Sequence, residues 1–193
     1  MQLSLAAVTG KVLEKSHGTI LRTIKLTETS LIVCWCTEEF GLLKTVAKGA
    51  RRPKSQFAGK LDLFHEAEID FARSKKSDLH TLRDIEVTDH RHGIRANYSR
   101  VLAASYFVRL IEMAAEPETP IKELHHLLHR ALGFLKEKAP DRRAVMFFEA
   151  ELTRHLGISD SDENPAVSLA NVYGDLPKQR EELLRRMPNP PQN

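Results

Sequence analysis

The first half of the chain alternates apolar and polar positions in short runs that turn-forming residues separate. Such runs, when rich in β-branched and aromatic residues, predict β-strands. A shorter alternation within residues 3–8 predicts a further strand, or a tail lying on the domain. The principal strands are expected at residues 17–25, 30–37, 42–48, 61–71 and 79–87.

About five short strands joined by turns make a meander-like order. An antiparallel sheet of this kind tends to curl into a small barrel, because closure removes the unpaired edges. Five strands in such a barrel are typical of the OB-fold. Trp35 lies in the middle of the second run, and we expect its ring in the barrel core.

From Ile94 onward the apolar spacing becomes helical. Apolar residues surround most of the first segment, which predicts a buried central helix. Later helices are marked by their ends: starts at Thr119-Pro120, Pro140-Asp141 and Asn164-Pro165, a stop at Gly157, and a last helix at 181–187. The sequence therefore predicts the α+β class, with an OB-fold domain over residues 1–87, an α-helical bundle over residues 88–187 and a disordered tail over residues 188–193.

Charge is uneven along these elements. The 193 residues carry a formal charge of +3, with 14 basic and 11 acidic side chains up to Val87 and 15 of each after it. The whole excess therefore lies in the predicted barrel, as a local patch that would steer a polyanion. No apolar run is long enough for a membrane span, and no secretory pattern opens the chain, so we expect a cytoplasmic protein. We expect Cys34 and Cys36 on opposite faces of their strand, sharing neither a disulfide nor a metal.

Residues 41–60, GLLKTVAKGARRPKSQFAGK, hold six cations and no acid. A basic loop of this kind is often only a solvated surface. Here it follows a strand, so the barrel would present it rigidly to a phosphate backbone. Phe57 is the candidate for stacking on a base, although the ring could instead anchor the loop. The cations that we expect to contact a nucleic-acid backbone, from this stretch and the next turn, are Lys44, Lys48, Arg51, Arg52, Lys54, Lys60, Arg73, Lys75 and Lys76.

The motif ELHHLLHR places His125 and His129 four residues apart, a spacing that can hold zinc. His126 occupies the position where a metalloprotease carries glutamate, and no third ligand is evident. A polar helix face is the better interpretation, so we predict no metal. No glycine-rich phosphate loop, GxSxG motif or nucleophile–base pair occurs. We therefore predict no catalytic residues, no enzymatic activity and no cofactor.

A longer pattern resembles a known family. Residues 28–69 read ETSLIVCWCTEEFGLLKTVAKGARRPKSQFAGKLDLFHEAEI and closely resemble the N-terminal domain of the bacterial RecO family. Its pattern is a strand ending in T-x-E-x-G, a V/A-K-G-A-R-x-x-x-S-x-F loop, and L-x-x-F. The segments NYSRVLAASYFVRLIEMAAE and FFEAELTRHLGI resemble the family's helical domain. The resemblance covers residues 19–158.

The resemblance implies a DNA repair and recombination mediator that is associated with the nucleoid. Such a protein binds single- and double-stranded DNA, anneals complementary strands and, with RecR, helps to load RecA onto DNA coated by single-strand-binding protein. It also implies that the helical domain binds the acidic C-terminal tail of that protein in a groove with a basic rim. Candidate contacts are Arg100, Arg109 and Arg130. Many relatives carry a four-cysteine zinc module after the position of Gly157, where this chain has no cysteine, so we predict no structural zinc.

Rival functions remain open at this point. An RNA-binding OB-fold protein would show a comparable cationic surface. A non-catalytic adaptor would use that surface for an acidic partner protein. A metal-dependent hydrolase would need His125 and His129 to hold a metal ion.

Overall fold

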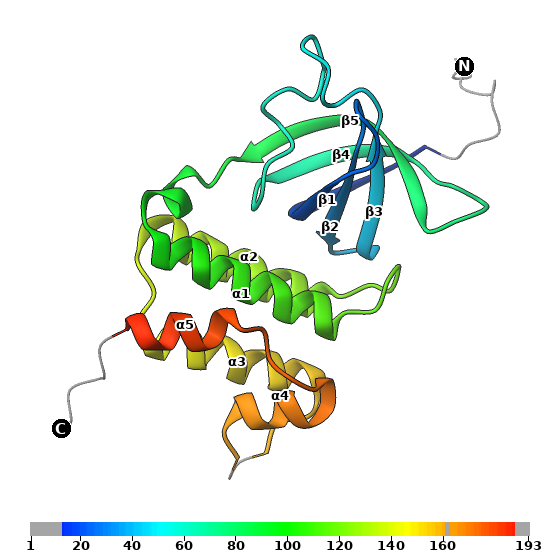
Figure 1. The fold of residues 1–193 in the computed structure, drawn as a ribbon. Helices are drawn as coiled ribbons and strands as arrows, with labels where there is room; N and C mark the ends of the chain where they lie inside the picture. Colours follow the sequence, from blue (N-terminus) through cyan, green and yellow to red (C-terminus); the bar gives the residue numbers. More distant parts are fainter. Residues whose placement is uncertain (1–12, 161–162, 188–193) are drawn as a thin grey trace, which may run out of the picture.

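The computed structural model describes residues 13–160 and 163–187, so the alternation at residues 3–8 and the tail at 188–193 lie outside the described residues. The described residues form a closed five-stranded barrel followed by helices (Figure 1). The α+β prediction is confirmed. The strands are β1 Leu13–Lys25, β2 Leu31–Thr37, β3 Gly41–Ala47, β4 Glu66–Ala72 and β5 Leu79–Asp89.

The long first strand closes the barrel. β1 pairs antiparallel with β2 along one part of its length and with β4 along another. The order around the barrel is β1-β2-β3-β5-β4, and β3 pairs with β5 in parallel through Lys44↔Leu79 and Thr45↔His80. The meander-like order was therefore wrong at this point, because β5 inserts between β3 and β4.

Apolar residues from every strand fill the barrel. Trp35 is fully buried there, as predicted, and its Nε1 donates a hydrogen bond to Thr45 Oγ1 at 2.9 Å. The bond satisfies the polar atom that burial would otherwise leave without a partner. Ile20 and Phe71 pack in the same core.

Two local predictions need correction. The predicted strand 61–71 begins only at Glu66, because Phe64 has a φ of 69° and residues 61–65 form a turn. Cys34 and Cys36 share one face of β2, since side chains two residues apart in a strand point the same way. Trp35 points into the barrel between them, and Cys36 packs in the helical core instead. Both thiols are free and buried.

The helical half starts with the 3-10 helix η1 His92–Ala96. The last strand, β5, ends at Asp89, two residues after the predicted domain boundary at Val87. The α-helices are α1 Tyr98–Ala114, α2 Lys122–Glu137, α3 Arg142–Leu156, α4 Pro165–Tyr173 and α5 Gln179–Arg186. Asp141 and Asn164 cap α3 and α4 as predicted, and Gly157 ends α3 with a φ of 68°. The expected cap at Thr119 is wrong, because α2 starts later, with Ile121 at the N-cap position and no side-chain bond.

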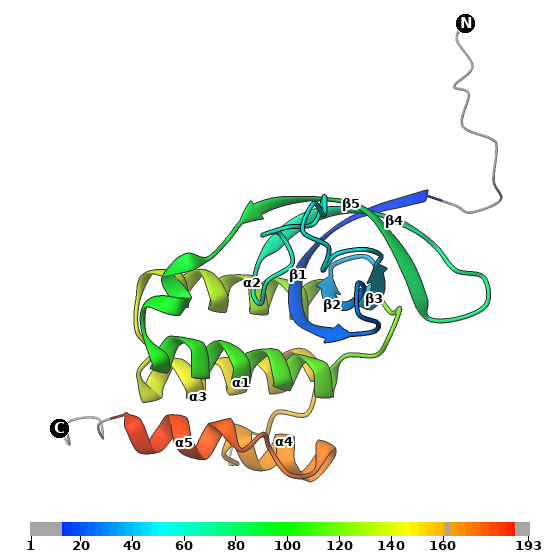
Figure 2. The same cartoon turned by 45° about the horizontal axis from the view of Figure 1, so that its top comes forward.

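The helices form layers beneath the barrel. α1 and α2 lie next to the barrel, and α3, α4 and α5 lie on their far side (Figure 1). Figure 2 shows α4 and α5 as the layer farthest from the barrel. Eight residues of α1 are buried, which agrees with its expected central position. Gly41 brings the β2–β3 turn against the segment before α2, where a Cβ at this position would lie 2.0 Å from Thr119 O. The barrel and the helices therefore pack closely, with no room for a larger residue at this contact.

Candidate nucleic-acid interface and a groove on the helices

The segment between β3 and β4 carries most of the predicted DNA contacts and is held at several points. Arg51 Nη1 donates to Glu28 O at 3.0 Å, and the Arg51 amide donates to Thr29 O at the same distance. Further along, Gln56 Nε2 donates to Arg83 O at 2.9 Å. These bonds join the segment to the β1–β2 turn and to β5. It is therefore a fixed element of the barrel surface.

Phe57 anchors this segment. The ring is only 4% exposed and packs in the barrel core. The prediction that Phe57 stacks on a base is therefore wrong for this conformation, because the ring faces the core. The alternative of a loop anchor describes its position.

The predicted cations fall into two groups. Some are engaged within the protein: Lys44 Nζ lies 2.9 Å from Asp78 Oδ2, Lys60 Nζ donates to Ile85 O, and Arg73 pairs with Glu118 at 2.7 Å. Arg51 belongs to the same group through its bond to Glu28 O. These four side chains hold the barrel surface together, so their charges are already partly neutralised or committed to carbonyl groups.

The second group is exposed and has no ion pair or side-chain hydrogen bond among the described residues. Its members are Lys48, Arg52, Lys54, Lys75 and Lys76. Lys48 and Arg52 also line a shallow hollow of about 410 Å³ beside the β1–β2 turn. We call these five residues the free cations. They are the side chains best placed to exchange counterions for phosphates.

The described barrel offers no exposed aromatic ring. Trp35, Phe57, Phe64 and Phe71 are buried, and Phe40 is half-buried below the Arg73 guanidinium, which lies 5.6 Å from the ring centroid. Base stacking on aromatic side chains is the usual sequence-tolerant contact to unpaired bases. This surface lacks that contact, so its chemistry is directed to the phosphate backbone.

The three arginines proposed for a partner's acidic tail do not share one site. Arg100 Nη1 donates to Gly93 O and Lys136 O, both at 3.0 Å, and so joins α1 to the end of α2. Arg109 pairs with Glu112 on its own helix at 2.7 Å. Arg109 also lines a hollow with Leu42 and Leu43 of the barrel, and Arg130 lines a separate apolar groove.

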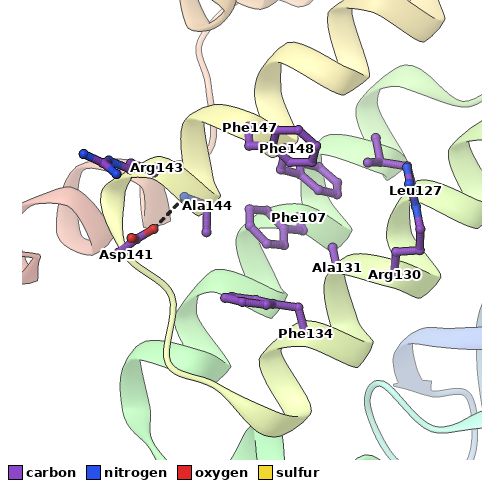
Figure 3. A pocket seen from close by; sticks show the side chains of 10 residues that line it. All are labelled: Phe107, Leu127, Arg130, Ala131, Phe134, Asp141, Arg143, Ala144, Phe147 and Phe148. Carbon is purple, nitrogen blue, oxygen red and sulfur yellow. Dashed lines mark hydrogen bonds between the residues drawn. The ribbon is translucent and has the colours of Figure 1, made fainter.

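That groove lies between α2 and α3 (Figure 3). It measures about 500 Å³, and its floor contains Phe107 and Phe148, whose rings stack with centroids 4.0 Å apart. Phe134 and Phe147 form its apolar walls, although they are 42% and 61% exposed. The remaining lining residues are Leu127, Arg130, Ala131, Asp141, Arg143 and Ala144.

The basic residues of the groove sit on its rim. Arg130 Nη2 lies 3.9 Å from Glu151 Oε2, which is a long distance for an ion pair, and the Arg130 side chain is mostly exposed. Arg143 has no ion pair among the described residues. The sequence did carry a signal for this groove, because Phe134 and Phe147 fall on faces that a soluble helix normally keeps polar.

The three histidines of α2 have different environments. His126 is exposed, whereas His125 is buried and its ring nitrogens have no hydrogen-bond partner among the described residues. Burial, followed by the charge of His17, lowers the pKa of His125 to about 4. His129 Nδ1 bonds to Glu66 Oε1 at 2.6 Å. The polar helix face expected here is therefore wrong for His125.

Family comparison agrees with this arrangement. The family model described as Recombination protein O N terminal matches residues 12–91, and the one described as Recombination protein O C terminal matches residues 95–159. The chain belongs to the RecO family. The first match covers the barrel and the second covers α1, α2 and α3, so both halves of the fold support the assignment.

Individual RecO relatives are moderately similar to the chain. A DNA repair protein RecO from Syntrophus aciditrophicus is 32% identical over 145 residues, which are 75% of this chain and 55% of that protein. Proteins of the same name from Rhodopirellula baltica and Salinibacter ruber are 29% and 30% identical, over 80% and 83% of this chain and 56% and 62% of their own lengths. The chain thus spans little more than half the length of these relatives.

These relatives carry the name DNA repair protein RecO, and both family models that match the chain are RecO models. Among the described helices, none combines the length and apolar character that a membrane crossing requires. The predicted lack of a cysteine zinc module stays a prediction. It agrees with a sequence that has its two cysteines in β2 and none after Cys36.

Proposed function

We propose that this chain is a non-enzymatic recombination mediator that binds single- and double-stranded DNA through the free cations of its barrel and promotes annealing. The proposal extends to RecR as a partner in loading RecA onto DNA coated by single-strand-binding protein. It includes the division into an OB-fold domain and a helical domain.

The observation that carries the proposal is a rigid cationic surface with no stacking ring. Lys48, Arg52 and Lys54 project from a segment that the barrel fixes through Arg51 and Phe57. Fixed cations neutralise phosphates without reading bases. Two strands brought to such a surface repel each other less, because part of each backbone charge is compensated. Annealing of any complementary pair would follow.

The helical groove supports the partner part of the proposal. An acidic peptide that ends in an apolar residue could place its last side chain between Phe134 and Phe147 and its carboxylates near Arg130 and Arg143. Arginine forms strong paired hydrogen bonds with carboxylates, and an apolar floor excludes water from them. The C-terminal tail of single-strand-binding protein has this chemistry. Of the three arginines expected in this contact, Arg130 remains and Arg143 joins it.

The test is the salt dependence of DNA binding in a K48A/R52A/K54A variant. Arg51 is left intact, because its side chain holds the segment to Glu28. Fluorescence anisotropy on labelled single-stranded DNA at several salt concentrations gives the slope of log K against log salt. Three lost contacts should reduce that slope by about 2, at roughly 0.7 per phosphate on a single strand. Affinity should fall equally for unrelated sequences.

A matched control removes two cations elsewhere. Lys178 and Arg185 are exposed at α5, on the far side of α1 from the barrel, and K178A/R185A should leave the slope unchanged (Figure 1). An unchanged slope in the triple variant would refute the barrel surface as the DNA site. RNA of equal length in the same assay tests the RNA-binding rival, which requires RNA to be preferred. Annealing of DNA coated by the cognate single-strand-binding protein, with and without RecR, tests the mediator role.

A further inference from the structure

A group of metal-ligating side chains lies where the barrel meets α2, away from the free cations and the groove. His17 comes from β1, Glu66 from β4 and His125 from α2. Each offers one ligand atom, and these atoms all lie within 4.8 Å of one another. His17 Nε2 and Glu66 Oε1 are 3.6 Å apart. A single ion could therefore contact residues that are far apart in the sequence.

His125 provides an independent observation that points to a ligand at this place. Its side chain is only 4% exposed, and neither ring nitrogen has a hydrogen-bond partner among the described residues. Buried polar atoms are almost always paired, because leaving them unpaired costs free energy. The ring packs edge-on against His17, with centroids 6.1 Å apart, so it already faces the other ligands.

Glu66 is positioned as a ligand would be. Its carboxylate is buried, with Arg91 Nη2 at 2.8 Å from Oε2 and His129 Nδ1 at 2.6 Å from Oε1. Arg91 is itself buried and also donates to Thr19 Oγ1 at 3.1 Å. Outer groups that hold a ligating carboxylate in place are a regular part of metal sites. Arg91 also offsets the charge of Glu66, which would moderate the affinity for a cation.

We propose that His17, Glu66 and His125 form a binding site for a divalent transition-metal ion, with Zn²⁺ as the best match. This departs from the sequence-based expectation of no metal, which considered only His125 with His129 and found no third ligand. Two imidazole nitrogens and one carboxylate oxygen suit zinc, whereas magnesium and calcium prefer oxygen ligands alone. The bound ion joins β1 and β4 of the barrel to α2. The half-exposed His17 side chain gives the ion a path from solvent.

A neighbouring set is the main alternative location. Glu38 and His126 also come within the same distance of a His125 nitrogen. Both are more exposed than Glu66, and Glu38 already pairs with Lys122 at 3.3 Å. The burial of Glu66 favours the first set, and the contacts of His17 Nε2 with Thr88 Oγ1 at 3.5 Å and Glu66 Oε1 at 3.6 Å are both long. Since the two sets share only His125, single variants can separate them.

The test uses the full chain after removal of metal with a chelator. Zn²⁺ is titrated by calorimetry, and thermal unfolding is recorded with and without it. One ion per chain is expected. At a free concentration about a hundredfold above Kd, the Tm should rise by about 5–10 °C. Co²⁺ in place of Zn²⁺ should give a visible absorption spectrum of nitrogen and oxygen ligation.

Histidine variants assign the ligands. His17→Asn, at a half-exposed position, should fold normally and lose at least tenfold in Zn²⁺ affinity together with the Tm rise. His126→Asn and His155→Asn are the controls, and they should keep both the Zn²⁺ affinity and the Tm rise of the unmodified protein. Because the His125 variant changes a buried residue, its apo Tm is measured before its affinity is interpreted.

Several results would overturn the proposal. One is the absence of Zn²⁺ binding by the unmodified chain at up to millimolar concentration. Another is unchanged binding in His17→Asn. A third is binding lost in His126→Asn but kept in His17→Asn, which would place the ion at Glu38 instead. None of these outcomes depends on DNA binding, so the proposed function and this site can fail separately.

Discussion

The buried ion pair between α3 and α5 gives the sharpest stability prediction. Glu149 is fully buried, and Arg180 Nε and Nη2 lie 2.7 and 3.2 Å from its two oxygens. Tyr106 of α1 donates to Glu149 Oε1 at 2.6 Å. The carboxylate thus joins three helices. Arg180→Met removes the only positive charge that contacts it among the described residues while keeping most of the apolar volume.

The expected loss of unfolding free energy in Arg180→Met follows from the burial of Glu149. Removing one partner of a buried ion pair leaves an uncompensated charge and costs about 3–5 kcal/mol of unfolding free energy. Arg180 keeps its side chain 22% exposed, so the lower part of that range is the better expectation. For a chain of this size, each 1 kcal/mol shifts Tm by roughly 2–4 °C. The variant should therefore melt about 6–12 °C below the unmodified protein.

Urea unfolding followed by circular dichroism measures the change. Arg186→Met is the matched control, because Arg186 pairs with Glu182 at the exposed surface of the same helix and should cost less than about 1 kcal/mol. Adding Glu149→Gln to Arg180→Met should recover part of the loss, since the neutral amide can still accept from Tyr106. A deficit below 1 kcal/mol in Arg180→Met, or no recovery in the double variant, would refute the account of a buried charge that needs its partner.

Two further predictions concern pH and the groove. Burial, followed by the charge of His17, lowers the pKa of His125 from 6.5 to about 4. As pH falls, the unfolded chain therefore binds a proton at His125 before the folded chain does. With chelator present, the contribution of His125 to the free energy of unfolding, about 3 kcal/mol, should be complete above pH 6.5 and disappear as pH falls toward 4. Chemical denaturation across that range should show a flatter profile for His125→Leu, and an equal slope would contradict the assignment. Phe147→Asp should weaken binding of an acidic peptide with an apolar C-terminal residue at least tenfold by calorimetry. Val172→Asp, at a similarly exposed position on α4, should not, and equal affinities of the two variants would exclude the groove.

Strand and helix positions could be predicted because their signals are local. The β-branched and aromatic composition of residues 30–37 indicates a strand, and Trp35 indeed points into the barrel. The caps at Asp141 and Asn164 were visible because a capping side chain bonds to backbone a few residues away. The parallel pairing of β3 with β5 was not visible, because it depends on how the barrel closes.

The location of the cationic stretch could be predicted from the sequence, but which of its cations are free could not. Sequence located the cationic stretch, yet Lys44, Arg51, Lys60 and Arg73 proved to be engaged within the barrel. Each of these partners lies 23 or more residues away in the sequence, so no local sequence pattern could reveal the contact. Burial of Phe57 likewise required the core to be assembled.

By itself, the sequence determined the α+β class, the excess charge of the first half and the RecO pattern of residues 28–69, since composition and local spacing carry these properties. Only the tertiary structure decided which cations are free, where an apolar groove opens between α2 and α3, and that His17, Glu66 and His125 meet. The physical reason is that exposure, pairing and ligand geometry are relations between distant residues. They exist only once the barrel has closed and packed against the helices.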